Sequence, residues 1–117
     1  MSYDFLLFKA KKTIQNASEL NESTTVTLGT ANELRAFIDE HIASIQWQVA
    51  FGILENETGW YEFLVGKDNE IMDALTIRTS FRQNRAETEK QIQDFCNKLG
   101  LIAFDGNNEK LILPTSA

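Results

Sequence analysis

Residues 47–79 contain three strand-like runs separated by two short polar turns, and this pattern limits the possible folds more than any other part of the sequence. The runs are Trp47–Ile53, Trp60–Val65 and Ile71–Thr79, and the turns are Glu55–Gly59 and Gly66–Glu70. Both turns contain glycine, which tolerates the positive φ angles of tight turns. Connections this short join antiparallel strands, because a parallel pair needs a crossover of about a dozen residues. The sequence therefore predicts an antiparallel meander.

An amphipathic helix is expected on each side of this meander. Thr30 and Glu33 have the spacing of a capping box, and the helix that follows has apolar positions at helical intervals: Leu34, Phe37, Ile38, His41, Ile42 and Ile45. A second helix is predicted between Asn84 and Leu99, with Gly100 as its left-handed stop. Its apolar stripe is Thr88, Ile92, Phe95, Cys96 and Leu99. Two helices with one apolar stripe each need one sheet face to cover.

The remaining segments complete the predicted sheet. Tyr3–Lys9 is apolar on both faces, as expected of a central strand, and a polar connection, Ala10–Ser23, leads to a short strand at Thr25–Leu28. Leu101–Phe104 and Lys110–Leu113 should form a hairpin around Asp105–Asn108. We therefore predict one α+β domain over residues 1–117, with element order β-(β)-α-β-β-β-α-β-β. It would be a two-layer sandwich of a mostly antiparallel five- to six-stranded sheet and two helices.

The composition argues against several classes of protein. The longest apolar runs are far shorter than the roughly 20 residues that span a bilayer, and the first residues lack the order of a secretory signal. The single cysteine, Cys96, cannot form an internal disulfide. We expect a cytoplasmic protein with no membrane partner.

Negative charge is concentrated in the middle of the chain. The whole chain has a formal net charge of −6, whereas residues 31–77 hold nine carboxylates against Arg35 and Lys67, a net charge of −7. Such a field repels phosphate backbones and attracts basic partners, so nucleic acid is not an expected partner. The alternative is that the acidity serves solubility only.

Catalytic and metal chemistry find little support in the sequence. His41, the only histidine, and Cys96 both fall on helix stripes, where we interpret them as packed core residues. No cysteine pair, His-x-x-x-His or calcium-loop pattern is present, and the glycines match no phosphate-binding motif. We expect neither an enzyme nor a cofactor or metal.

The meander supplies the main candidate binding surface. If Tyr61, Phe63 and Val65 face the helices, Trp60, Glu62 and Leu64 face outward. Aromatic residues are common interface anchors, so Trp60 and Tyr61 with the neighbouring acids could bind a basic protein, although Trp47 and Trp60 could instead be core residues. The predicted partner-binding residues are Glu55, Glu57, Trp60, Tyr61, Glu62, Asp68, Glu70 and Asp73.

A basic cluster provides an alternative site. Arg78, Arg82 and Arg85 run from the end of a strand into the start of a helix, where backbone N–H groups favour anions. They could bind a phosphate or carboxylate, or they could pair with Glu87, Glu89 or the acids of the middle segment.

Five segments together resemble a pattern found in small bacterial α+β proteins of uncharacterised role. They are VTLGTANELRAFID (Val26–Asp39), Trp47, GILENETGWYEFLVG (Gly52–Gly66), ALTIRT (Ala74–Thr79) and FCNKLGLIAFD (Phe95–Asp105). The matching positions are core, cap and turn positions, so the resemblance implies a fold and no functional residue. In size and charge the chain is also similar to immunity proteins of contact-dependent and polymorphic toxin systems.

The leading hypothesis is therefore a non-enzymatic acidic protein-binding module, an immunity-type inhibitor that occludes a basic, nuclease-like toxin. One alternative is a small-molecule or anion sensor that uses the three arginines. Another is a homo-oligomer that buries the outward sheet face against its own copy.

Overall fold

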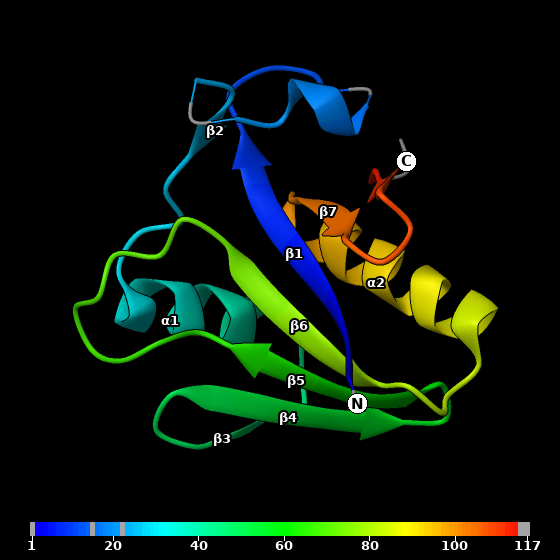
Figure 1. Ribbon diagram of the computed structural model, residues 1–117. Helices are drawn as coiled ribbons and strands as arrows, with labels where there is room; N and C mark the ends of the chain where they lie inside the picture. The colour runs from blue at the N-terminus through cyan, green and yellow to red at the C-terminus, as the bar shows by residue number, and fades with distance from the viewer. Residues whose placement is uncertain (1, 15, 22, 115–117) are drawn as a thin grey trace.

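The computed structural model describes residues 2–14, 16–21 and 23–114, which form eight strands, two α-helices and a short 3-10 helix (Figure 1). In chain order these elements are β1 (Ser2–Ala10), η1 (Ala17–Glu19), β2 (Thr25–Val26), α1 (Ala31–His41), β3 (Gln46–Trp47), β4 (Phe51–Asn56), β5 (Gly59–Leu64), β6 (Leu75–Ser80), α2 (Arg85–Leu99), β7 (Ile102–Asp105) and β8 (Lys110–Ile112). The α+β class is confirmed. Gln15 and Glu22 of the predicted polar connection lie outside the described residues.

All strand pairings are antiparallel in the part of the chain that the structure describes. The strand order is β3-β4-β5-β6-β1-β7-β8, and β2 pairs with the end of β1. β1 lies between β6 and β7, with Phe5 opposite Ile77 on one side and Asp105 on the other. The prediction of an interior first strand is thus confirmed, and its apolar residues on both faces explain that position.

The sheet has eight strands rather than five or six, because it includes the short β2 and because the run Trp47–Ile53 is not one strand. The chain reverses after Trp47, where the Gln48 N–H donates to the Phe51 carbonyl at 2.7 Å, and β3 then pairs with β4. Gly52 allows this close approach, since a Cβ there would lie 2.5 Å from the Trp47 ring. Gly52 and Leu54 face the core, while Phe51 and Ile53, which belong to the more apolar of the two alternating sets in this run, point the other way.

The third predicted strand also starts later than expected. β6 begins at Leu75, whereas Ile71 forms an isolated bridge with Thr30 and is 60% exposed. Met72 pairs through its backbone with Leu28 and Gly29. Residues 71–72 therefore pair with the segment that precedes α1 instead of extending β6.

The first helix begins as predicted but buries a narrower stripe. The Thr30–Glu33 capping box is present, and Leu34, Ile38 and Ile42 are buried. The assignment of Phe37 and His41 to the core was wrong: both are exposed, and their rings lie 4.6 Å apart on the outside of the helix. The helix ends at His41, and its buried residues, Ala31, Leu34 and Ile38, lie along one narrow side that Ile42 continues at the C-cap.

The second helix matches its prediction. Asn84 caps it by accepting a hydrogen bond from the Glu87 N–H, and Gly100 follows its end at φ 67°. All five residues of the predicted stripe are buried. Burial raises the pKa of the Cys96 thiol to about 12, as expected of a packed and unreactive cysteine.

Both helices and the sheet share one hydrophobic core. The ring of Phe95 in α2 lies 5.4 Å from Tyr61 and 5.1 Å from Phe63 in β5, and Leu34 and Ile38 of α1 belong to the same cluster. In Figure 1 both helices lie behind the sheet. The sheet surface that points away from this core, called the outer face below, is where the predicted binding residues must be sought.

Candidate functional site

A row of half-buried side chains, all apolar except Thr76, crosses the outer face. The cross-strand register places Phe51, Leu64, Thr76, Leu6, Phe104 and Leu111 side by side from β4 to β8. Each of these side chains is partly exposed. We call this set the apolar row.

A charged row lies beside the apolar row. Arg78 stands between Asp4 and Glu62 in the register, with Nε 3.3 Å from Asp4 and Nη1 3.9 Å from Glu62. Ile53 continues the row on β4. One arginine against two carboxylates leaves the charged row with a net negative charge.

Trp60 and two predicted acids gather at the end of the sheet where β4 turns into β5. Trp60 is half-buried on the outer face and is paired with Glu55, and Glu57 is exposed in the turn itself. The Trp60 backbone N–H donates to Gln83 Oε1 at 3.0 Å, which connects this end of the sheet to the segment before α2. We call Glu55, Glu57, Trp60 and Glu62 the acidic end.

The assignment of Tyr61 to a binding surface was wrong. Its side chain is 0% exposed and packs against Phe95, and its hydroxyl hydrogen-bonds the Thr58 hydroxyl at 2.7 Å. Burial raises the pKa of Tyr61 above its usual value. Adjacent strand residues face opposite sides, so Trp60 and Tyr61 cannot both meet a partner.

The other predicted acids lie elsewhere. Asp68, Glu70 and Asp73 are exposed in the loop that joins β5 to β6, at the opposite end of β5 from Glu57 (Figure 1). A six-residue strand separates the two groups by roughly 20 Å. The backbone carbonyls of Asp68 and Glu70 accept from the first N–H groups of α1, so this loop caps a helix. The eight predicted residues therefore do not form one patch.

Two of the three arginines are held by acids, and each by different ones. Arg78 is held by Asp4 and Glu62 on the outer face, whereas Arg85, the first residue of α2, pairs with Asp105 at 3.3 Å and Glu89 at 3.7 Å. Arg82 is exposed between them in sequence. The pairing with acids, which was the alternative to an anion site, is therefore what the structure shows for Arg78 and Arg85.

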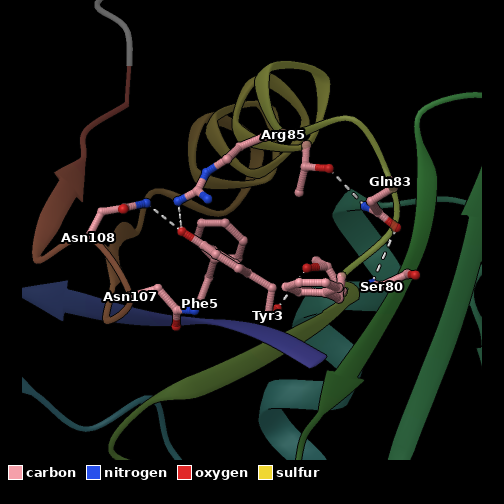
Figure 2. Close-up of a pocket in the computed structure, with 10 residues that line it drawn as sticks. Tyr3, Phe5, Ser80, Gln83, Arg85, Asn107 and Asn108 are labelled. Carbon is pink, nitrogen blue, oxygen red and sulfur yellow. Dashed lines mark hydrogen bonds between the residues drawn. The ribbon is translucent and has the colours of Figure 1, made fainter. Parts of the chain in front are cut away.

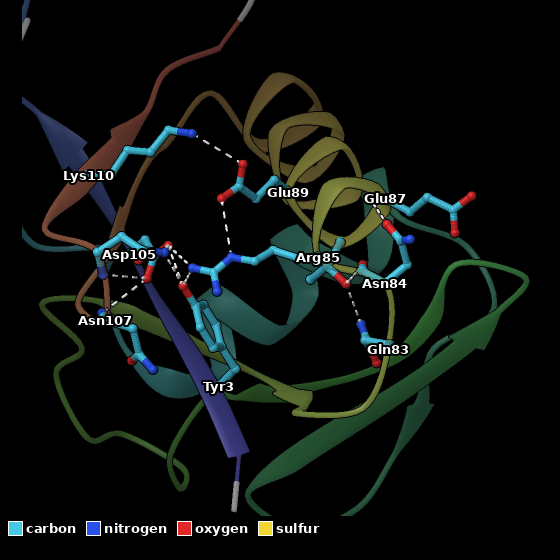
Figure 3. Close-up of polar contacts among 11 residues, drawn as sticks. Tyr3, Gln83, Asn84, Arg85, Glu87, Glu89, Asp105, Asn107 and Lys110 are labelled. Carbon is cyan, nitrogen blue, oxygen red and sulfur yellow. Dashed lines mark hydrogen bonds and ion pairs between the residues drawn. The ribbon is translucent and has the colours of Figure 1, made fainter.

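A polar network that the sequence did not reveal surrounds Asp105 (Figure 3). This carboxylate is 0% exposed. Its Oδ2 accepts from the Tyr3 hydroxyl at 2.6 Å and the Asn108 amide at 2.8 Å, and it lies 3.3 Å from Arg85 Nη2. The Tyr3 hydroxyl in turn accepts from Arg85 and Asn108. The network joins the start of β1, the start of α2 and the β7–β8 turn.

Sequence patterns could not have identified this network. Asp105 and Asn108 were interpreted only as turn residues, and the Asp105 Oδ1 does accept from the Asn107 N–H at 3.0 Å, as in an Asx turn. Tyr3, Arg85 and Asp105 are brought together only by the pairing of β1 with β7 and by the packing of α2. The one available signal was a carboxylate directly after an apolar strand.

A pocket of about 300 Å³ opens beside the network (Figure 2). Its walls include the rings of Tyr3, Phe5 and Phe81 and the polar side chains of Ser80, Gln83, Arg85, Asn107 and Asn108. We call this cavity the Tyr3 pocket.

Comparison with protein families, curated proteins and solved structures finds no match to this chain. The similarity to immunity proteins thus remains an expectation from size and charge. Among the described residues, no helix is long and apolar enough to cross a bilayer, and no three His, Cys, Asp or Glu side chains are grouped as metal ligands would be.

Proposed function

We propose that this chain is a non-enzymatic, cytoplasmic protein-binding module that presents the outer face and the acidic end to a basic protein partner. In this proposal the fold acts as a two-layer sandwich: two helices close one face of the sheet and leave the other for the partner. The carrying observation is the apolar row with carboxylates beside it. Among the described residues, neither helix lies over this side of the sheet in Figure 1.

Charge supports a basic partner. The outer face and the acidic end hold Asp4, Glu55, Glu57 and Glu62 against Arg78, a net charge of −3. Carboxylates of this kind speed the encounter with a cationic surface and repel nucleic acid. Trp60 adds a half-buried indole to the same end, and tryptophan is enriched among interface anchors.

The partner class that fits best is a basic nuclease domain of a toxin, which this chain would inhibit by occlusion. An inhibitor of this kind needs surface complementarity and no catalytic group of its own. We expect the neighbouring gene to encode a secreted protein with such a domain, and a neighbour of unrelated type would contradict the immunity role.

The test is the association rate between this chain and that domain, measured by stopped-flow fluorescence at low and high salt. We expect the rate to fall at least about tenfold between roughly 0.02 and 0.5 M salt, because exposed charges are screened. The double variant Glu55→Lys/Glu57→Lys should slow association further, and Trp60→Ala should speed dissociation.

The matched control is the double variant Asp68→Lys/Glu70→Lys, which makes the same charge change at the opposite end of the sheet. It should alter the rate much less than the Glu55/Glu57 variant. Equal effects of the two variants, or a rate independent of salt, would contradict docking at the acidic end. Light scattering that shows a dimer closed by the outer face would favour the homo-oligomer instead.

A further inference from the structure

The Tyr3 pocket lies at the edge of the core and has aromatic walls. Phe5 and Tyr3 lie in its floor and are 1% and 9% exposed, whereas Phe81 at its mouth is 64% exposed. The guanidinium of Arg85 sits 4.3 Å above the Tyr3 ring (Figure 2). At about 300 Å³ the cavity matches the smallest ligand pockets, which suits a single ring system.

The hydrogen bonds around the pocket leave specific groups free. Both polar atoms of Gln83 are engaged, since its oxygen accepts from the Trp60 and Ser80 N–H groups and its amide nitrogen donates to Thr88. Within the described part of the chain, neither Arg85 Nη1 nor the side-chain amide of Asn107 has a protein hydrogen-bond partner. The free groups are thus the N–H donors of Arg85 Nη1 and the side-chain amide of Asn107, which can both donate and accept a hydrogen bond.

The charges around the pocket are already balanced. Arg85 pairs with Asp105 and Glu89, and Lys110 lies 3.2 Å from Glu89, so two cations face two carboxylates (Figure 3). An anionic ligand would compete with these carboxylates for Arg85, and a cationic ligand would be repelled by Arg85. A neutral ligand meets neither penalty.

From this geometry we infer that the Tyr3 pocket is a binding site for a small, neutral aromatic molecule with an amide-like donor–acceptor edge, such as an aromatic carboxamide or a free nucleobase. Its ring would contact Phe81, and its polar edge would meet Arg85 Nη1 and Asn107. The site is independent of the outer face and of the proposed protein partner. It also differs from an anion site made of three arginines, because only Arg85 lines it.

The test is titration of the ¹⁵N-labelled full chain with four probes, followed by two-dimensional NMR. Nicotinamide and thymine are neutral aromatic molecules with an amide edge, nicotinate is the anionic counterpart of nicotinamide, and propionamide has the amide without the ring. We expect the neutral aromatic probes to give saturable shifts at Ser80, Arg85 and Asn107, with a Kd on the order of 1 mM for ligands this small.

The key variant is Phe81→Ala, and its control is Ile71→Ala. Both side chains are exposed, at 64% and 60%, so neither truncation removes core packing. Phe81→Ala should weaken nicotinamide binding about fivefold through the lost ring contact, and Ile71→Ala should leave it unchanged.

Three results would overturn the inference. The first is the absence of localised, saturable shifts with both nicotinamide and thymine. The second is binding of nicotinate or propionamide as tight as that of nicotinamide. The third is an equal effect of the two alanine variants.

Discussion

Removing the Tyr3 hydroxyl tests whether the buried network stabilises the fold. Tyr3→Phe keeps the ring contacts with Phe5, at 5.2 Å between centroids, and with Arg85. It deletes the hydrogen bond to the Asp105 carboxylate together with the two that the hydroxyl accepts from Arg85 and Asn108. A hydrogen bond to a charged group contributes about 1.5–3 kcal/mol, so we expect a loss of about 2 kcal/mol.

Tyr61→Phe is the matched control. Tyr61 is also buried, at 0% exposed against 9% for Tyr3, but its hydroxyl partner is the neutral Thr58 hydroxyl, so we expect a loss of about 1 kcal/mol. Urea unfolding near pH 7, followed by tryptophan fluorescence, measures both values, and the slope with urea should be unchanged. The melting temperature should fall by roughly 8 °C for Tyr3→Phe and roughly 4 °C for Tyr61→Phe. Equal losses, or no loss for Tyr3→Phe, would refute the argument that the Asp105 network is a strong stabilising element.

Three further predictions concern other parts of the fold. The pKa of the Cys96 thiol is about 12 in the folded chain against an ordinary value of 9.0, so the thiol ionises first in the unfolded chain. The free energy of unfolding should therefore fall by about 1.4 kcal/mol per pH unit as pH rises from 9 to 12. Cys96→Ala should reduce that pH dependence, measured by urea unfolding at alkaline pH. Gly59→Ala should cost about 2 kcal/mol or more by thermal unfolding, since φ is 144° and a Cβ would collide with the engaged Gln83 amide. Thr30→Ala should cost about 1 kcal/mol by loss of the capping box, and an unchanged unfolding midpoint would contradict that role.

The predictions that held depend on local signals. The Thr30–Glu33 box and Gly100 are short-range patterns that act through the backbone hydrogen bonds of the helix ends, so they mark those ends reliably. The predictions that failed depended on which side of a helix or strand faces the core. In Trp47–Ile53 the large apolar residues alternate with Gln48, Ala50 and Gly52, yet Gly52 faces the core, because the Trp47 ring packs over it after the chain reverses.

In the candidate sites too, local patterns were predicted correctly and contacts between distant segments were not. The alternation of β5 correctly placed Phe63 and Val65 in the core and Trp60 on the outer face. It could not show that Asp68 and Glu70 lie at the far end of β5 from Glu57, because that depends on where the chain reverses. The network around Asp105 joins residues 102 positions apart, Tyr3 and Asp105, and no local pattern reports such a contact.

The α+β class, the positions of the two helices, the first strand's interior position and the excess of carboxylates in the middle of the chain were determined by the sequence. These properties follow from short-range periodicity and from counting charges. Tertiary structure decided which charges meet: it neutralised Arg78 on the outer face, buried Asp105 beneath Arg85 and opened a pocket beside them. Coulomb and hydrogen-bond energies depend on distance in space, and that distance is set only when β1, α2 and β7 pack together.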